Sequence, residues 1–410
     1  LDASKASKLA AKGAQISEGH AAENVGVVDA IVISTAIPAD NPEVAAARVK
    51  GIPVLHRSEM LGWFLARGES VLIAGTHGKT TTTALTGLLL EAAQRDPWCF
   101  VGGRVEQYQG NVRVGGTPLA VAEADESDGS FLNLPRHQLL ITNLEAEHMN
   151  YWKSFEALER GFFDLVEGLP EDRPFVTCLD DPGVVDFLGR SPRRAIGYSL
   201  AKHPDAEFTA EEIVLGGESS SFTLFQRGRR LCRVRIGIPG RHNVANAVGA
   251  FALAASMGVD VSPLGEALAQ FHGVDRRFTK RIGPAGFLVI DDYAHHPTEI
   301  AATVAAARQL ARERGGRLLG VFQPHRYSRI GALFSSFGKC FGELDELFVL
   351  DIYSGGEPPI PGVSGQSFFE KVRSQYSFPV QFVAELDGVK KRVEEMLKID
   401  DIVLLLGAGS

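Results

Sequence analysis

A strand, a glycine turn and the start of a helix follow one another within residues 71–83, VLIAGTHGKTTTT. The apolar run 71–74 is typical of a buried strand, and a helix-compatible stretch begins at Lys79. Glycines let backbone N–H groups turn towards an anion, and the helix start adds partial positive charge. The lysine can reach the outer phosphates of a nucleotide, and the next hydroxyl can hold Mg²⁺. The segment therefore predicts a parallel α/β unit that binds a nucleotide through Gly75, Thr76, His77, Gly78, Lys79, Thr80 and Thr81.

This loop is shorter than the usual phosphate-binding pattern. The pattern has four residues between its two glycines, and Ile73 holds the place of the first glycine. The alternative is a plain glycine turn before a threonine-rich helix. The order of strand, loop and helix favours the phosphate site.

Length and composition limit the remaining choices. A chain of 410 residues is too long for one core, so we expect two or three domains. The formal charge of −8 argues against a nucleic-acid partner. Four scattered cysteines suit a reducing cytoplasm, and we find neither a membrane-spanning run nor a signal peptide. Because residue 1 enters a helix-like stretch and no helix follows the last strand, we expect the natural protein to extend beyond both ends.

The pattern of helices and strands predicts three α/β domains. Residues 1–68 are typical of part of a Rossmann-like domain, with a buried strand at 27–33. Residues 69–278 form a central domain around the phosphate loop, with a mostly parallel sheet and an antiparallel hairpin at 221–236. Residues 279–410 alternate between strand and helix, which predicts a doubly wound Rossmann-like domain.

Acidic residues and a histidine follow two predicted strands of the central domain. Glu123 ends a strand beside the phosphate loop, where a nucleotide-bound Mg²⁺ is usually held; the alternative is a solvated acidic loop. His148 follows the strand 139–142. A lone histidine is more often structural, but its place near Glu123 suggests a ligand of a second Mg²⁺.

Two further motifs lie near the end of the central domain. In GRHNVANA at 240–247, Asn243 is either a helix N-cap or, with Asn246, a reader of an adenine edge. In RRF at 276–278, Arg277 is either part of a basic linker or an arginine that reaches the γ-phosphate when domains close.

The last block carries polar residues after its first two strands. Metal binding by His295 and His296 is not expected, because adjacent side chains diverge and no third ligand has a suitable spacing. Arg326 and Arg329, three residues apart, suit a substrate carboxylate.

These motifs together, over essentially the whole chain, resemble the Mur ligases of bacterial cell-wall synthesis. Any one motif is shared among sister enzymes, but EADESDGSFL with QPHRYSR points to the alanine-adding member. The motifs are GTHGKTTTT at 75–83, EADESDGSFL at 123–132, GRHNVANA at 240–247, RRF at 276–278, DDYAHHPTE at 291–299, QPHRYSR at 323–329, DIYSGGE at 351–357 and GAG at 407–409.

The resemblance implies an ATP- and Mg²⁺-dependent ligase whose partners are small molecules, UDP-N-acetylmuramate and L-alanine, and which is a monomer or a weak homodimer. The lactyl carboxylate takes the γ-phosphoryl group, and the amine of L-alanine then attacks the acyl phosphate. The catalytic residues it implies are Lys79, Glu123, His148 and Arg277, with Thr80, Glu123 and His148 as metal ligands. It implies ATP contacts from Asn243, Asn246, Arg277 and Asp292, and substrate contacts from His20, Ser34, Ile37, His295, Arg326 and Arg329.

The sequence departs from the family pattern in three places. The family's N-terminal glycine-rich loop for the uridine diphosphate is absent. Glu147 and Asn150 replace the usual aspartates around His148. Phe163 stands near the place of a modified lysine found in sister ligases, which agrees with the alanine-adding member.

Three other hypotheses remain. The nearest is a sister ligase that adds another amino acid, or the enzyme that joins recycled tripeptide to UDP-N-acetylmuramate. A nucleotide-binding switch would not need a cleft lined by several domains. A dinucleotide-dependent oxidoreductase lacks support, because neither flanking block shows Gly-x-Gly-x-x-Gly after its first visible strand.

Overall fold

The computed structural model describes residues 3–283 and 286–409, which form two compact units. The first unit ends at Arg67 and also contains Ser130–Pro135, and the second holds the rest of the described chain. The boundary expected at residue 278 lies inside the second unit and stays a prediction. Among the described residues, no helix combines the length and the apolar character that crossing a membrane requires.

The first unit contains a short parallel pair of strands, with Ile31 opposite Val54. The buried strand expected at 27–33 is wrong, because Val27 is fully exposed and only three residues are paired. Strand hydrogen bonds form only where a partner runs alongside, and the second strand is equally short. The elements of this unit are α1 (Ala3–Ala11), η1 (Ala22–Asn24), β1 (Ile31–Ile33), α2 (Pro42–Val49), β2 (Val54–His56), α3 (Arg57–Leu65) and η2 (Ser130–Asn133).

A ten-stranded sheet forms the central part of the second unit, in the order β12-β11-β10-β9-β8-β7-β3-β6-β4-β5. The strands from β9 to β4 are parallel, β10 is also parallel to β9, and β5, β11 and β12 run antiparallel to their neighbours. The hairpin expected at 221–236 is confirmed as β11 and β12. The strands are β3 (Ser70–Ala74), β4 (Trp98–Val105), β5 (Gly110–Arg113), β6 (Ala120–Glu123), β7 (Gln138–Ile141), β8 (Phe175–Cys178), β9 (Ala195–Ser199), β10 (Phe208–Leu215), β11 (Ser220–Gln226) and β12 (Arg229–Ile236).

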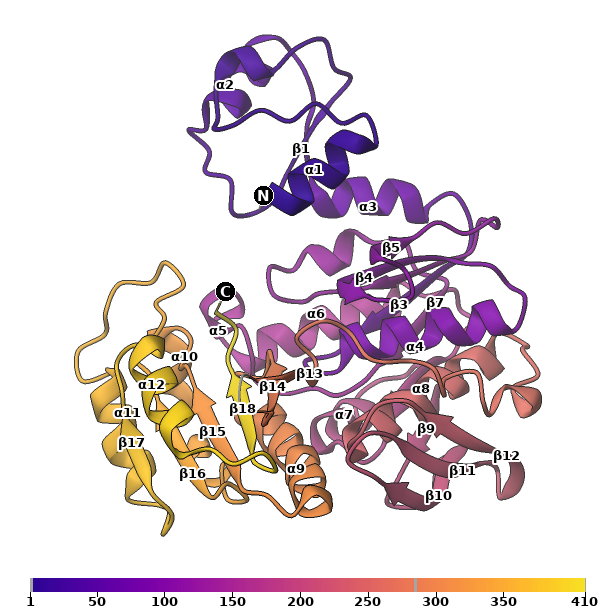
Figure 1. Cartoon of the computed structure of the whole chain (residues 1–410). Coiled ribbons are helices and arrows are strands. Elements are labelled where there is room, and N and C mark those ends of the chain that lie inside the picture. The colour runs from indigo at the N-terminus through magenta and orange to yellow at the C-terminus, as the bar shows by residue number, and fades with distance from the viewer. Residues whose placement is uncertain (1–2, 284–285, 410) are drawn as a thin grey trace. The chain divides into compact units, whose positions relative to one another are not determined.

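Helices cover this sheet and create its core. Figure 1 shows α4 lying against the sheet near β3 and β4, and α8 packs against α4 as well as β7–β11. Both helices are buried almost all round, including the threonines of α4, because other elements enclose them. The helices are α4 (Lys79–Ala92), α5 (Met149–Trp152), α6 (Phe155–Glu167), α7 (Pro182–Leu188), α8 (Arg241–Ser256) and η3 (Ser262–Leu264).

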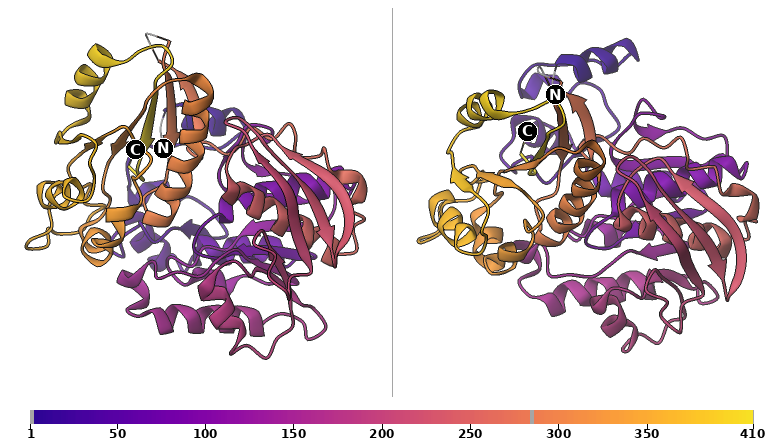
Figure 2. Two further views of the ribbon diagram at one scale, coloured as in Figure 1. Left: turned by 90° about the horizontal axis from the view of Figure 1, so that it is seen from below. Right: turned by 60° about the horizontal axis from the view of Figure 1, so that its bottom comes forward.

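A six-stranded sheet, in the order β13-β14-β18-β15-β16-β17, forms the C-terminal part of the second unit. All its strands are parallel except β13, which pairs antiparallel with β14. Apolar side chains are buried on both faces, as in a doubly wound sheet, and α9 packs on one of them (Figure 2). The elements are β13 (Thr279–Ile282), β14 (Leu288–Asp292), α9 (Pro297–Arg314), β15 (Leu318–Phe322), α10 (Tyr327–Leu333), η4 (Ser336–Lys339), β16 (Glu346–Val349), α11 (Gly365–Arg373), β17 (Val380–Phe382), α12 (Leu386–Met396) and β18 (Ile402–Leu406).

Candidate active site

The glycine loop turns between β3 and α4 in a conformation that requires glycine. Gly75 has φ +121°, and a Cβ atom there would lie 2.2 Å from Thr142 Oγ1. Gly78 has φ +80° and is the N-cap of α4, so the helix starts directly after the turn. Its missing Cβ would lie 2.7 Å from Asn246 Oδ1. The loop therefore leads directly into the N-terminus of a buried helix. A glycine turn followed by a helix N-terminus is an arrangement that binds anions.

The segment after β7 holds this loop in place. Asn143 Oδ1 accepts from the backbone N–H of His77 at 2.8 Å, and Asn143 Nδ2 donates to the carbonyl of His77 at 3.0 Å. The hydroxyl of Thr76 accepts from the N–H of Glu145 at 2.9 Å. These supporting roles of Asn143 and Glu145 were not predicted from the sequence. The available signal was that both follow a strand parallel to β3, at the same sheet edge.

Lys79 is buried at the base of the loop. Its Nζ donates to the carbonyl of Gly75 at 2.7 Å and to Glu126 Oε2, also at 2.7 Å. Burial would lower the pKa of the ammonium, but Glu126 and Asp125 raise it above its ordinary value. The lysine is therefore charged at neutral pH and lies next to the glycine loop.

Thr80 and Glu123 meet beside the loop. The hydroxyl of Thr80 donates to Glu123 Oε1 at 3.0 Å, and Glu123 Oε2 accepts from the N–H of Gly102 at 2.8 Å. Since β6 is the immediate neighbour of β3, the carboxylate at its end lies close to the helix start. The structure thus brings together the two residues that the sequence paired for a first cation.

A second group of possible cation ligands contains His148, Asp125 and Glu126. Glu126 is fully buried, and its Oε1 has no hydrogen-bond partner in the described part of the chain. This oxygen lies 3.6 Å from Nε2 of His148. Burial lowers the pKa of His148 to about 4, so the neutral ring keeps a lone pair for a metal.

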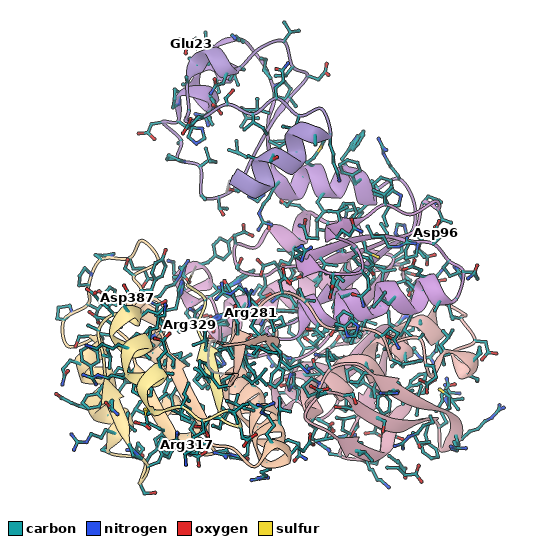
Figure 3. All side chains as sticks on the ribbon, viewed as in Figure 1. Glu23, Asp96, Arg281, Arg317, Arg329 and Asp387 are labelled. Carbon is teal, nitrogen blue, oxygen red and sulfur yellow. The ribbon has the colours of Figure 1, made fainter. Side chains whose placement is uncertain are left out.

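Glu147, one of the departures from the family pattern, has a different partner. Its Oε1 accepts from both Nε and Nη2 of Arg329, at 3.0 and 2.6 Å. Arg329 belongs to α10 and is labelled in Figure 3. Burial opposes ionisation of Glu147, but Arg329 and neighbouring histidines hold its pKa at about 2. The carboxylates available to His148 are therefore Asp125 and Glu126.

A cavity of about 270 Å³ opens beside the loop. Asn243 and Asn246 line it, together with apolar and aromatic side chains such as Tyr198. The N-cap alternative for Asn243 is wrong, because Gly240 caps α8 and Asn243 lies within the helix, where its Nδ2 donates to Pro239. Amide groups beside apolar walls suit a flat heterocyclic base.

Arg277 and Asp292 line the same cavity. The guanidinium of Arg277 lies 3.5 Å from Glu299 Oε1. Asp292 accepts from the backbone N–H groups of Phe278 and Ala294, both at 2.8 Å, and its burial raises its pKa to about 6. Asp292 therefore also holds together the segment before β13 and the segment after β14.

The C-terminal histidines and arginines lie near carboxylates. Arg326 lies 3.6 Å from Glu357, and Nδ1 of His295 faces the carbonyl of Tyr293 at 2.9 Å. His296 forms a compact group with His77 and Glu145. The spacing of neighbouring residues in the sequence does not indicate this group. His296 Nδ1 accepts from the N–H of Thr298, so this ring also caps α9.

The three predicted uridine-nucleotide contacts lie in the first unit. Ser34 directly follows β1, and its carbonyl accepts from the N–H of Ile37 at 3.0 Å. His20 is exposed and lies 3.4 Å from Glu43. Their roles stay predictions.

Sequence comparisons place most of the chain in one family. Three family models match: "Mur ligase family, catalytic domain" over residues 2–69, "Mur ligase middle domain" over 73–254, and "Mur ligase, glutamate ligase domain" over 276–409. A UDP-N-acetylmuramate–L-alanine ligase of Solidesulfovibrio magneticus is 41% identical over 98% of this chain and 87% of its own length. Another, from Anaeromyxobacter dehalogenans, is 42% identical over 98% of this chain and 86% of its own length.

Solved structures agree with the three-domain α/β fold expected from the sequence, which is confirmed. The UDP-N-acetylmuramate-alanine ligase of Thermotoga maritima aligns with TM-score 0.80 and 28% identity, covering 98% of this chain and 87% of its own. A MurF ligase of the same organism, solved with ADP, shares the fold at 16% identity and TM-score 0.68, covering 93% of this chain and 92% of its own. This chain belongs to the Mur ligase family.

Proposed function

We propose that this protein is an ATP-dependent ligase that joins L-alanine to the lactyl carboxylate of UDP-N-acetylmuramate in the synthesis of peptidoglycan precursors. The observation that carries the proposal is the phosphate loop with the Thr80–Glu123 pair and the adjoining cavity, in a chain about 41% identical to ligases of that name. The Mur ligase family uses ATP, and the loop, Lys79 and the cavity suit its phosphates and base.

The donor atoms fit Mg²⁺ at two places. Thr80 and Glu123 offer hydroxyl and carboxylate oxygens, the ligand type that Mg²⁺ prefers. Oε1 of Glu126, which has no hydrogen-bond partner among the described residues, and the neutral ring of His148 offer a second set, to which Asp125 can add. When bound, Mg²⁺ neutralises charge on the γ-phosphoryl group and holds it in place.

The chain's own cations support the first half of the reaction. A lactyl carboxylate oxygen attacks the γ-phosphorus, the bond to the leaving oxygen breaks, and ADP and an acyl phosphate result. Lys79 beside the loop and Arg277 at the cavity wall stabilise the charge that builds up on the transferring group.

In the second half, the amine of L-alanine attacks the acyl carbon. The carbon–oxygen bond to phosphate then breaks, and the nitrogen loses a proton. We assign the substrate carboxylates to Arg326 and Arg329, with His295 close by, and the uridine nucleotide to His20, Ser34 and Ile37.

We further propose that three domains, 1–68, 69–278 and 279–410, perform these tasks in a monomer or a weak homodimer. Since the reaction consumes ATP and a nucleotide-linked sugar, we place it in the cytoplasm.

Phosphate release from ATP tests the proposal. With Mg²⁺ and UDP-N-acetylmuramate, we expect release that depends on added L-alanine. A preference for another amino acid or a tripeptide would favour a sister ligase. Tight ATP binding without turnover for any amino acid would favour a nucleotide switch and end the ligase assignment.

A further inference from the structure

Glu299, in the first turn of α9, contacts several parts of the site that sequence motifs do not connect. Its Oε1 lies 3.3 Å from Nδ1 of His77 in the phosphate loop and 3.5 Å from Nη1 of Arg277. Its Oε2 accepts from the backbone N–H groups of His295 and His296, at 3.2 and 3.4 Å. One carboxylate, which is 12% exposed, thus joins the loop, the arginine of the cavity and the start of a C-terminal helix.

The group contains two carboxylates, Glu145 and Glu299, that lie against two basic side chains, His77 and Arg277. His77 lies between Glu145 and Glu299, with its Nε2 3.3 Å from Glu145 Oε2. Burial works against protonation, but hydrogen bonds to the two carboxylates raise the pKa of His77 to about 9. His77 is therefore an imidazolium at neutral pH, and Glu299 is the carboxylate that it shares with Arg277.

The start of α9 also contacts Glu145, one of the residues that hold the phosphate loop in place. The hydroxyl of Thr298 donates to Glu145 at 2.8 Å, and Glu145 in turn supports Thr76 through its backbone N–H. Because Thr298 and Glu299 are consecutive, the first turn of α9 is held from two sides by residues that hold the phosphate loop. These contacts give a change of the loop on nucleotide binding a direct route to this turn.

We propose that Glu299 is a positioning residue that aligns Arg277 with the phosphate loop and transmits nucleotide binding at the loop to helix α9 of the C-terminal part. The inference rests on the proposed binding of ATP at the loop, and it adds a residue that contributes no contact to the reacting atoms. Its side chain acts through its charge on His77 and Arg277, beyond its local role as a cap of α9.

Hydrogen exchange with Mg²⁺ and the non-hydrolysable analogue AMP-PNP tests the proposal. In the wild type, we expect nucleotide to protect amides at 76–81 and also at 295–302. In Glu299→Gln, which keeps a hydrogen-bond acceptor for the cap, protection at 76–81 should remain and added protection at 295–302 should vanish. At saturating ATP, kcat should fall about tenfold while the nucleotide Kd changes less than about threefold.

Three results would overturn the inference. Wild-type protection at 295–302 in the variant would show that Glu299 transmits nothing. Unchanged kcat would show that Arg277 does not need it. Faster exchange at 295–302 in the variant before nucleotide is added would reduce Glu299 to a helix cap. Failure of the wild type to bind the analogue would be a different result, since it would refute the proposed function itself.

Glu313→Gln is the matched control. Glu313 lies at the other end of α9 and accepts from the N–H of Gly217 at 2.9 Å, so it also links this helix to the central part. It lies outside the site, and we expect wild-type coupling. In a second comparison, His77→Asn combined with Glu299→Gln should lose no more kcat than the more severe single variant. Losses that multiply would mean that the two side chains act independently and would contradict the proposal.

Discussion

Proton binding by His77 should make the stability of the central and C-terminal parts depend on pH. The ring is largely buried, and hydrogen bonds to Glu145 and Glu299 raise its pKa to about 9 in spite of that burial. In an unfolded chain the pKa of a histidine is near 6.5. Below pH 6.5 both states carry the proton, and the stabilisation is complete. Between pH 6.5 and 9 only the folded state keeps the proton, so stability is lost as pH rises.

The size of the effect follows from the two pKa values. Each pKa unit corresponds to about 1.4 kcal/mol, so the protonated ring contributes about 3 kcal/mol at pH 6.5 and almost nothing above pH 9. Because other groups titrate over this range, the quantity to compare is the wild type minus His77→Asn. This difference should shrink by about 3 kcal/mol between pH 6.5 and 9.5.

Urea unfolding at 25 °C, followed by tryptophan fluorescence at several pH values, measures this difference. Trp98 and Trp152 lie in the second unit and report on it. An NMR titration of the histidine rings gives the pKa directly, through the resonance that is missing in the variant. Parallel pH profiles for the two proteins, or a His77 resonance that titrates near 6.5, would refute the ion-pair account.

Three further substitutions test the site. Lys79→Ala should abolish turnover with an unchanged circular dichroism spectrum, since the buried lysine contacts the loop carbonyls and Glu126 rather than the apolar side chains of the core; wild-type activity would remove the phosphate-loop assignment. Glu123→Ala should raise the Mg²⁺ concentration needed for half-maximal rate steeply, and an unchanged Mg²⁺ titration would count against its role as a ligand. Gly75→Ala should destabilise the loop by about 1–3 kcal/mol and weaken ATP binding, because the new Cβ meets Thr142 at a positive φ; wild-type ATP affinity would mean that the loop relaxes freely.

Local sequence patterns predicted the elements that carry most of the site. The run before Gly75, the carboxylate at Glu123 and the hairpin at 221–236 each depend on a few neighbouring residues, and the structure has the expected elements there. The prediction of a strand at 27–33 was wrong because this strand depends on a segment that is not its neighbour in the sequence. Its length depends on how much of β2 runs beside it, which composition does not reveal.

The contacts missed by the sequence all join distant segments. Glu145 lies 68 residues after His77, and Glu299 lies 154 residues after Glu145, yet both face the same imidazole ring. His296 likewise meets His77 and Glu145 only through the fold. The residues next to a histidine in a loop do not indicate which distant carboxylates it contacts, so rules based on sequence spacing cannot predict such a group.

The short phosphate loop has a physical explanation in this arrangement. Ile73, at the place of the usual first glycine, is fully buried in β3 and pairs with Glu123 and Leu140 on the neighbouring strands. The strand therefore continues where longer loops already begin to turn. The N–H of His77 donates to Asn143 instead of to a ligand. In the proposed complex with ATP, the phosphates meet the first turn of α4, whose N–H groups have no partner within the helix, and Lys79. A loop held by the segment after β7 does not need the extra glycine, because Asn143 and Glu145 already fix its first half and leave its second half for the proposed contact with ATP.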